Sequence, residues 1–140
     1  MIAAADGGCR DLDPLSPLTR THFTRLDRAG RFDAPATGGV RIVSGEAGRE
    51  ALGTRVRFEL RVDGETVLEA RFQAYGCPHT LAVANWLAGE LAGRRRDALL
   101  PGAPADWAAR FEVPVPKLGR LLLVEDALRA CLTNWPGPVQ

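Results

Sequence analysis

The sequence has little cysteine, and its cysteines are spread along the chain. Cys9, Cys77 and Cys131 lie far apart, form no Cys-x-x-Cys pair and are odd in number. This pattern argues against a disulfide framework and against a zinc finger built from paired cysteines. The simplest compartment for such a chain is a reducing cytoplasm, and we expect a cytoplasmic protein.

Long apolar runs are also missing. No stretch approaches the about 20 apolar residues that cross a bilayer, and residues 1–6 lack the basic region of a signal peptide. Positive and negative charges nearly balance, with a formal net charge of +1. We therefore expect a soluble, unexported protein that binds neither membrane nor nucleic acid.

Common catalytic motifs are absent too. The chain has no phosphate-binding glycine loop, no nucleophile elbow and no His-Glu-x-x-His. A turnover enzyme is therefore not the favoured interpretation, although the sequence leaves that question open.

The residues that are present predict one α+β domain. With 140 residues, 46% of them apolar, the chain can bury a core of its own. We expect a loose segment at 1–15, a single domain at 16–135 and a tail at 136–140. The domain should be a small three-stranded antiparallel sheet covered by helices.

Hydrophobic period and turn residues locate the elements. Apolar residues alternate with charged ones from Arg55 to Val62, which predicts a half-buried strand, and Asp63-Gly64 predicts a hairpin turn after it. Glycines predict a turn at 44–48. The expected helices are 18–28, 78–92, 104–111 and 118–134, and the other expected strands are 40–43 and 66–75.

The chemistry concentrates where the strand 66–75 meets the helix that follows. Pro78 suits the first turn of a helix, so Cys77 should lie at or near its N-cap. Helix N-termini stabilise a thiolate, the form of cysteine that attacks sulfur and binds metal. His79 could act with Cys77 as acid, base or second ligand, or could form only a local hydrogen bond. Cys77 could equally be a small buried apolar residue.

Two motifs resemble one known family. Residues 69–77, Glu-Ala-Arg-Phe-Gln-Ala-Tyr-Gly-Cys, resemble the strand that leads to the second cysteine of IscU/NifU N-terminal-type iron–sulfur cluster assembly scaffolds, which share their fold with the SufE sulfur acceptors. Residues 117–128 resemble the final helix of these scaffolds. The resemblance covers about residues 18–135 and implies the SufE/IscU-like fold.

The resemblance also implies a cluster site, and this chain departs from the family at most of its positions. The family's Ala-Cys-Gly-Asp appears here as Ala-Leu-Gly-Thr at 51–54, so Leu52 and Thr54 replace two ligands. The family's Lys-Leu-His-Cys appears as Lys-Leu-Gly-Arg at 117–120, so Gly119 and Arg120 replace two more. Cys77 is the only matched ligand. The family's chaperone motif, Leu-Pro-Pro-Val-Lys, appears as Val-Pro-Val-Pro-Lys at 113–117.

Three functions follow as alternatives. The favoured one is a scaffold-like protein of iron–sulfur cluster assembly in which Cys77 accepts persulfide sulfur and Arg120 stabilises its anion. The second is a docking module for a cysteine desulfurase or another assembly protein. The third is a sulfur acceptor similar to SufE. The family implies an iron–sulfur cluster as cofactor, but Cys77, with His79 as a second candidate, falls short of the about four ligands of a two-iron cluster.

Overall fold

The computed structural model describes residues 15–32 and 38–135. The predicted segment 1–15 lies almost wholly outside these ranges, as do Cys9 and the tail 136–140. Three strands and four helices, with short 3₁₀ turns between some of them, make up the described part, which confirms the α+β class. Their bounds are α1 Pro17–Thr24, β1 Val40–Arg49, η1 Glu50–Leu52, β2 Thr54–Asp63, β3 Thr66–Tyr75, α2 Pro78–Leu91, η2 Arg96–Ala98, α3 Pro104–Phe111, η3 Val115–Lys117 and α4 Leu118–Asn134.

The three strands form one antiparallel sheet in the order β1-β2-β3. The alternation along β2 sorts its side chains as expected: Val56, Phe58, Leu60 and Val62 are buried on the inner face. The hairpin between β2 and β3 turns at Gly64, whose φ of 62° is the left-handed conformation that favours glycine. The predicted strand 66–75 is confirmed at both ends.

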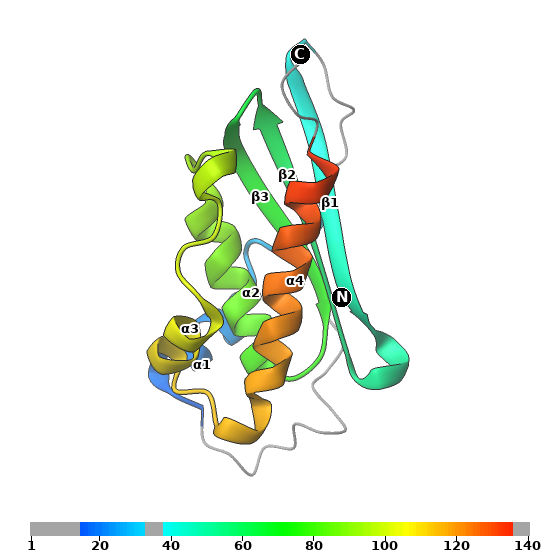
Figure 1. Ribbon diagram of the computed structural model, residues 1–140. Coiled ribbons are helices and arrows are strands. Elements are labelled where there is room, and N and C mark those ends of the chain that lie inside the picture. The colour runs from blue at the N-terminus through cyan, green and yellow to red at the C-terminus, as the bar shows by residue number, and fades with distance from the viewer. Residues whose placement is uncertain (1–14, 33–37, 136–140) are drawn as a thin grey trace.

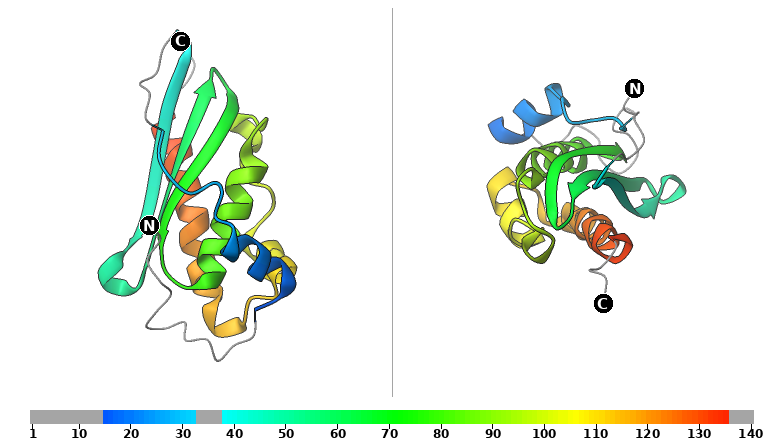
Figure 2. Two further views of the ribbon diagram at one scale, coloured as in Figure 1. Left: turned by 180° about the vertical axis from the view of Figure 1, so that it is seen from behind. Right: turned by 90° about the horizontal axis from the view of Figure 1, so that it is seen from above.

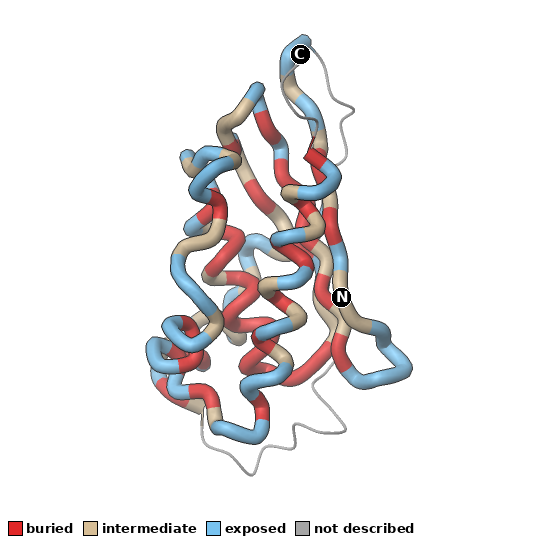
Figure 3. The backbone as a smooth tube through the Cα atoms, in the orientation of Figure 1, coloured by how far each residue is buried: buried red, intermediate tan, exposed pale blue. Residues whose placement is uncertain are grey.

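Helices α2 and α4 lie side by side on the inner face of the sheet, with α2 against β3 and α4 against β1 and β2 (Figure 1). Views from behind and from above show the sheet with its opposite face turned away from both helices (Figure 2). Burial follows this layering, because buried segments line the contact between sheet and helices (Figure 3). Within the described residues, no helix is long and apolar enough to cross a membrane.

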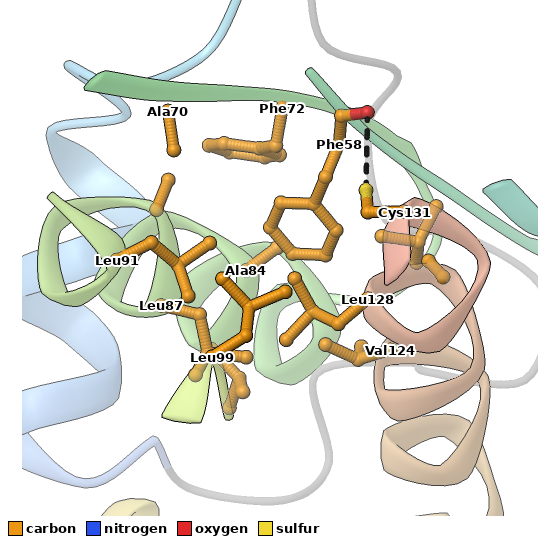
Figure 4. Packing of buried hydrophobic residues seen from close by; sticks show 14 of the residues in the cluster. Phe58, Ala70, Phe72, Ala84, Leu87, Leu91, Leu99, Val124, Leu128 and Cys131 are labelled. Carbon is orange, nitrogen blue, oxygen red and sulfur yellow. Dashed lines mark hydrogen bonds between the residues drawn. The ribbon is translucent and has the colours of Figure 1, made fainter. Parts of the chain in front are cut away.

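The core fills the space between these two layers. The Phe58 ring projects from the sheet toward Leu128 of α4, with Leu87 of α2 close by (Figure 4). Leu99, which follows η2, closes the same cluster from the far side. Every one of these side chains is almost fully buried, so sheet and helices depend on one shared core.

The predicted turn at 44–48 is wrong, because β1 continues without a break to Arg49. The glycines of this segment are needed because other backbone segments pack closely against β1, and not because the chain turns there. A Cβ at Gly45 would contact the backbone nitrogen of Cys131 and lie 2.6 Å from the backbone oxygen of Ala127, so α4 can pack here only against glycine. The strand β1 therefore has 10 residues, where the apolar run Val40–Val43 suggested four.

The first helix is shorter than predicted. It starts at Pro17, capped by the Ser16 hydroxyl, which accepts a hydrogen bond from the backbone N–H of Thr19, and it ends at Thr24 rather than near residue 28. Residues 25–32 form a segment, here named the strap, that runs along the edge of β3. The Gly30 N–H donates to the carbonyl of Phe72 at 2.8 Å, and the Phe72 N–H donates to the carbonyl of Arg28 at 3.1 Å. This backbone pairing covers part of an otherwise open sheet edge.

Candidate functional site

The junction of β3 and α2 has the predicted form. Strand β3 ends at Tyr75, and Cys77 is the N-cap of α2 with an extended backbone conformation (φ −82°, ψ 165°). Pro78 occupies the first helical position, and the Cys77 carbonyl accepts the first intrahelical hydrogen bond from Leu81 N–H at 3.1 Å. The Cys77 side chain thus lies at the positive end of a helix of 14 residues.

Two threonines surround this junction. The Cys77 Sγ lies 3.5 Å from the Thr80 hydroxyl in the first turn of α2. A Cβ built on Gly76 would lie 3.6 Å from both the Cγ2 of Thr54 and the Cβ of Thr80, so the start of β2 and the start of α2 meet there. Cys77 is only 2% exposed, and Thr54 and Thr80 are buried beside it. The thiol is therefore held inside the protein rather than presented on its surface.

His79 lies in the same first turn and is also buried, with 1% exposure. It therefore does not face solvent. Its proposed pairing with Cys77 as acid, base or ligand stays a prediction.

A third segment, the start of α4, lies at the same end of the molecule as the Cys77 junction and the turn η1 (Figures 1 and 2). Arg120 is in the first turn of α4. Its Nη1 is buried and has no hydrogen-bond acceptor among the described residues. Gly119 is exposed, with no atom within 4 Å of where a Cβ would stand.

Apolar side chains reach solvent around this end. Leu52 in η1 is 80% exposed, and Val115 in η3 and Leu118 and Leu122 in α4 are exposed as well. Large exposed apolar side chains that gather on one region are typical of an interaction surface. We refer to these four residues as the apolar rim.

A model of the NifU-like N terminal domain matches residues 21–140 of the chain. The chain belongs to this family. It is 27% identical over 115 residues to the iron–sulfur cluster assembly scaffold protein IscU of Escherichia coli K12, and this match covers 81% of this chain and 88% of that protein. It is also 26% identical over 121 residues to the iron–sulfur cluster assembly protein IscU of Plasmodium falciparum, covering 86% and 72%.

Solved structures share the fold of this NifU-like domain. A Fervidobacterium islandicum protein described as an iron–sulfur cluster assembly scaffold for the SUF system superposes with a TM-score of 0.63, covering 84% of this chain and 95% of that one. The N-terminal part of a NifU-like protein from Brucella abortus gives a TM-score of 0.55, covering 86% and 95%. Sequence identities are 14% and 13%, so these two matches establish the fold alone.

The ligand positions implied by the family can now be placed on the structure of this NifU-like domain. Thr54 and Cys77 come together at the β3–α2 junction, whereas Leu52 and Gly119 are exposed, and Arg120 has one buried guanidinium nitrogen. Leucine, glycine and arginine supply no metal ligand of the thiolate or imidazole type. Among residues 15–32 and 38–135, no group of three or more His, Cys, Asp or Glu side chains could hold a metal ion. The side chains at these positions therefore do not fit a cluster held by three thiolates.

The other buried cysteine provides a contrast with Cys77. Cys131 lies within α4, where its Sγ is 3.8 Å from the Phe58 carbonyl (Figure 4). Burial raises the pKa of the Cys131 thiol to about 12, although Arg57 acts in the opposite direction. At neutral pH almost none of it is thiolate, so Cys131 is an inert part of the core.

Sequence reasoning missed a polar contact that attaches α1 and the strap to α2. Asn85, in the apolar stripe of α2, accepts a hydrogen bond from the Arg28 N–H at 3.0 Å and donates one to the Arg25 carbonyl at 3.3 Å. Its amide nitrogen also lies 3.0 Å from His22 Nδ1. An asparagine among apolar residues was the one available signal, and nothing near it in the sequence identifies its partners. His22 itself is partly buried.

Proposed function

We propose that this chain takes part in iron–sulfur cluster assembly as a scaffold-like protein that receives sulfur on Cys77. Its membership of the NifU-like family supports a role beside proteins that bear that name. The observation that carries the proposal is the position of Cys77, the single matched cysteine, at the N-cap of α2. The unpaired N–H groups of a first helical turn favour negative charge, and sulfur transfer requires a thiolate.

The sulfur step needs no cluster ligand other than this one thiol. The partner that the family implies is a cysteine desulfurase, which would carry the sulfur as a persulfide. The Cys77 thiolate attacks the outer sulfur, the bond between the two donor sulfurs breaks, and the donor thiolate leaves with that electron pair. A Cys77 persulfide forms, and no external oxidant or reductant is consumed.

Arg120 is the residue we propose as stabiliser of the resulting anion. It lies in the first turn of α4, which starts at the same end of the fold, and its Nη1 is a buried donor with no acceptor among the described residues. A guanidinium donor in this state is satisfied best by an anion, since charge-assisted hydrogen bonds are the strong ones. An Arg120→Gln variant should therefore accept sulfur more slowly.

Access to Cys77 has to change during the reaction, because a thiol that is 2% exposed cannot meet a donor. The apolar rim lies at the same end and offers a partner a surface on which to bind. We expect docking of the partner there to accompany exposure of the thiol. Labelling of Cys77 by a soluble alkylating agent should then be slow in the isolated protein and faster with the desulfurase present.

Mass spectrometry after incubation with a desulfurase and cysteine tests the proposal. Cys77 should gain about 32 Da, the mass of one sulfur atom. Cys131 should gain nothing and serves as the internal control, because its raised pKa keeps it protonated. Sulfur on Cys9 or Cys131 in place of Cys77, or an Arg120→Gln variant no slower than Arg129→Gln, would contradict the proposal.

Reconstitution with iron and sulfide under anaerobic conditions separates this role from cluster holding. We expect the protein to retain no visible absorbance after desalting, because Leu52, Gly119 and Arg120 replace ligands. A stable coloured protein would show instead that the chain still assembles a cluster, with ligands from elsewhere.

A second candidate is a docking module without sulfur chemistry. The burial of Cys77 together with the exposure of the apolar rim favours it. In that case Cys77→Ser should keep both partner binding and cellular effect, whereas Leu52→Asp combined with Leu122→Asp should lose partner binding. Loss of cellular effect in Cys77→Ser with partner binding intact would instead support the sulfur acceptor.

A further inference from the structure

The outer face of the sheet, opposite α2 and α4, is built largely from arginine and glutamate. Its ion pairs join five arginines to four glutamates, one of them Glu50 of η1, which leaves an excess of one positive charge. We name this surface the arginine face. Its members are Arg31 of the strap, Arg55, Arg57, Glu59 and Arg61 of β2, Glu46 of β1, Glu50 of η1, and Glu69 and Arg71 of β3.

Around Glu59 and Glu69 the arginines are more exposed than the carboxylates they pair with, whereas the Glu46 side chain is itself 45% exposed. The Glu59 side chain is 5% exposed, and it accepts hydrogen bonds from the Arg31 Nε at 3.1 Å, the Arg57 Nη2 at 3.0 Å and the Phe32 N–H at 2.9 Å. The Arg31 side chain above it is 61% exposed. A partner approaching the face around Glu59 and Glu69 therefore meets guanidinium groups before it meets those two carboxylates.

Phe32 marks the centre of the most exposed part of the arginine face. The guanidinium carbons of Arg61 and Arg71 lie 5.6 Å and 5.4 Å from the centre of its ring. Both arginines share Glu69, at 3.1 Å and 3.3 Å, and their side chains stay 44% and 40% exposed. An aromatic ring flanked by arginines is the composition enriched at the energetic centres of protein interfaces.

The pKa values of two carboxylates on this face are lowered by the groups that bind them. Burial acts to raise the pKa of Glu59, yet hydrogen bonds from Phe32, Arg57 and Arg31 bring it below its ordinary value. The pKa of Glu46 is lowered as well, chiefly by its hydrogen bond from Arg55. The local field therefore favours carboxylate groups on this face.

Unused donors on these arginines favour carboxylates as the ligand. A guanidinium has five N–H donors in a planar fork, and Arg61 uses only its Nη2 to donate a hydrogen bond to Glu69. The remaining outward donors can hold a second carboxylate with the same geometry. A nucleic acid would instead require a long, strongly basic tract, and this chain has a net charge of +1 and a single lysine, Lys117.

We infer that the arginine face is a docking surface for the acidic face of another protein, centred on Arg61, Arg71 and Phe32. Its centre lies on β2, β3 and the strap, whereas the apolar rim belongs to η1, η3 and α4, so the inference goes beyond the proposed function and would stand without it. The partner's Asp and Glu side chains would bind the free donors of Arg31, Arg61 and Arg71. Because these contacts are exposed, the association should weaken as salt is added.

A fluorescent oligoglutamate peptide titrated with the full chain tests this inference by anisotropy. We expect binding at low salt that is lost at physiological salt. Arg61→Gln and Arg71→Gln should each weaken binding by about twofold to fivefold, the usual range for one exposed ion pair. Arg129→Gln is the matched control. Arg129 is exposed on α4 and pairs with Glu125 at 3.0 Å, so this variant loses the same charge from the helical layer instead of the sheet, and it should bind the peptide as the unchanged protein does.

Arg61→Lys and Arg71→Lys guard against misfolding, since they keep the charge and should retain most of the binding while circular dichroism reports the fold. No binding at low salt, an equal loss in Arg129→Gln, or tighter binding of a single-stranded oligonucleotide of matched charge would overturn the inference. None of these measurements uses a sulfur donor. The docking surface and the sulfur transfer to Cys77 can therefore fail independently.

Discussion

The contact of Asn85 with His22 allows a sharp test of how α1 is held. The Asn85 Oδ1 accepts from the backbone N–H of Arg28, which can only donate, and its Nδ2 donates to the carbonyl of Arg25, which can only accept. These two bonds fix which end of the amide faces His22. The second hydrogen on Nδ2 then points to His22 Nδ1 at 3.0 Å, so that ring nitrogen must be an acceptor. The folded protein thus requires a neutral His22 with its proton on Nε2.

Asn85→Ala removes all three hydrogen bonds. Each contributes about 0.5–1.5 kcal/mol net, and because water can reach the exposed strap, we expect a loss of about 2–3 kcal/mol in the free energy of unfolding. Asn134→Ala is the matched control, since Asn134 makes one hydrogen bond, to the Ser44 carbonyl at 2.7 Å, from an exposed position. It should lose no more than about 1 kcal/mol. Urea denaturation at about pH 7.5 measures both, provided that the slope m is unchanged.

The protonation of His22 decides whether the stability of the folded protein rises or falls with pH. Burial lowers the pKa of His22 below its ordinary value, while the carboxylates of Asp27 after α1 and Glu90 on α2 act to raise it. The unfolded chain therefore binds the proton more readily, so stability is full above the unfolded pKa and is lost as pH falls through the folded pKa. Protonation would place an N–H on Nδ1 against the N–H of Asn85. Phe111 of α3, whose ring is 5.7 Å from that of His22, offers no charge in compensation.

Asn85→Asp should reverse this response. A carboxylate still accepts the Arg28 N–H, and it accepts from a protonated His22 Nδ1, so the pKa of His22 should rise above its ordinary value. Ring-proton NMR titration measures that pKa directly, and Asn134→Asp is the control that should leave it unchanged. A His22 pKa that does not rise in Asn85→Asp, or an Asn85→Ala loss no larger than that of Asn134→Ala, would refute the assignment of these hydrogen bonds.

Two further predictions concern packing and charge. Gly45→Ala should destabilise the protein by about 1–3 kcal/mol or more, because the added Cβ would collide with the backbone of α4. Gly119→Ala, in open space, should stabilise it by up to about 1 kcal/mol. Urea denaturation checks both, since the midpoint should fall in the first variant and rise in the second. Glu59→Gln should lose about 1–3 kcal/mol at neutral pH and flatten the acid side of the stability curve. The reason is that a carboxylate with a lowered pKa stabilises the fold above its unfolded pKa and ceases to do so as pH falls through the folded one; an unchanged acid limb would contradict this.

Much of the fold could be predicted because its signals are local. The period of two in β2, the turn at Gly64 and the proline after Cys77 each act within a few residues, and the structure confirms all three. The last helix, Leu118–Asn134, was predicted at both ends, since a dense apolar run follows a proline-rich link. Such features can be predicted without knowing which segment packs against them.

The failures came where distant segments decide the local structure. The glycines of β1 predict a turn by composition, yet Gly45 allows the close approach of Ala127 and Cys131 in α4, which lie more than 80 residues further along the chain. The helix α1 ends early because Asn85 and Phe72 supply hydrogen-bond partners to the strap. The site shows the same limit: the family motif located Cys77, but its burial depends on Thr54 and Thr80 meeting around Gly76, which no single stretch reveals.

Burial also accounts for which site positions could change in this chain. Leu52 and Gly119 are exposed, and no core contact depends on them, so ligands there could be lost while the sheet and the helices α2 and α4 stayed intact. Cys77, by contrast, is enclosed at a helix start, where a larger side chain would strain the packing. Its presence alone is therefore weak evidence for sulfur chemistry. The decisive observation is whether Cys77, rather than the equally buried but inert Cys131, becomes modified when a sulfur donor is supplied. Both thiols are buried to the same degree, so modification of Cys77 alone would reflect its reactivity and not its exposure.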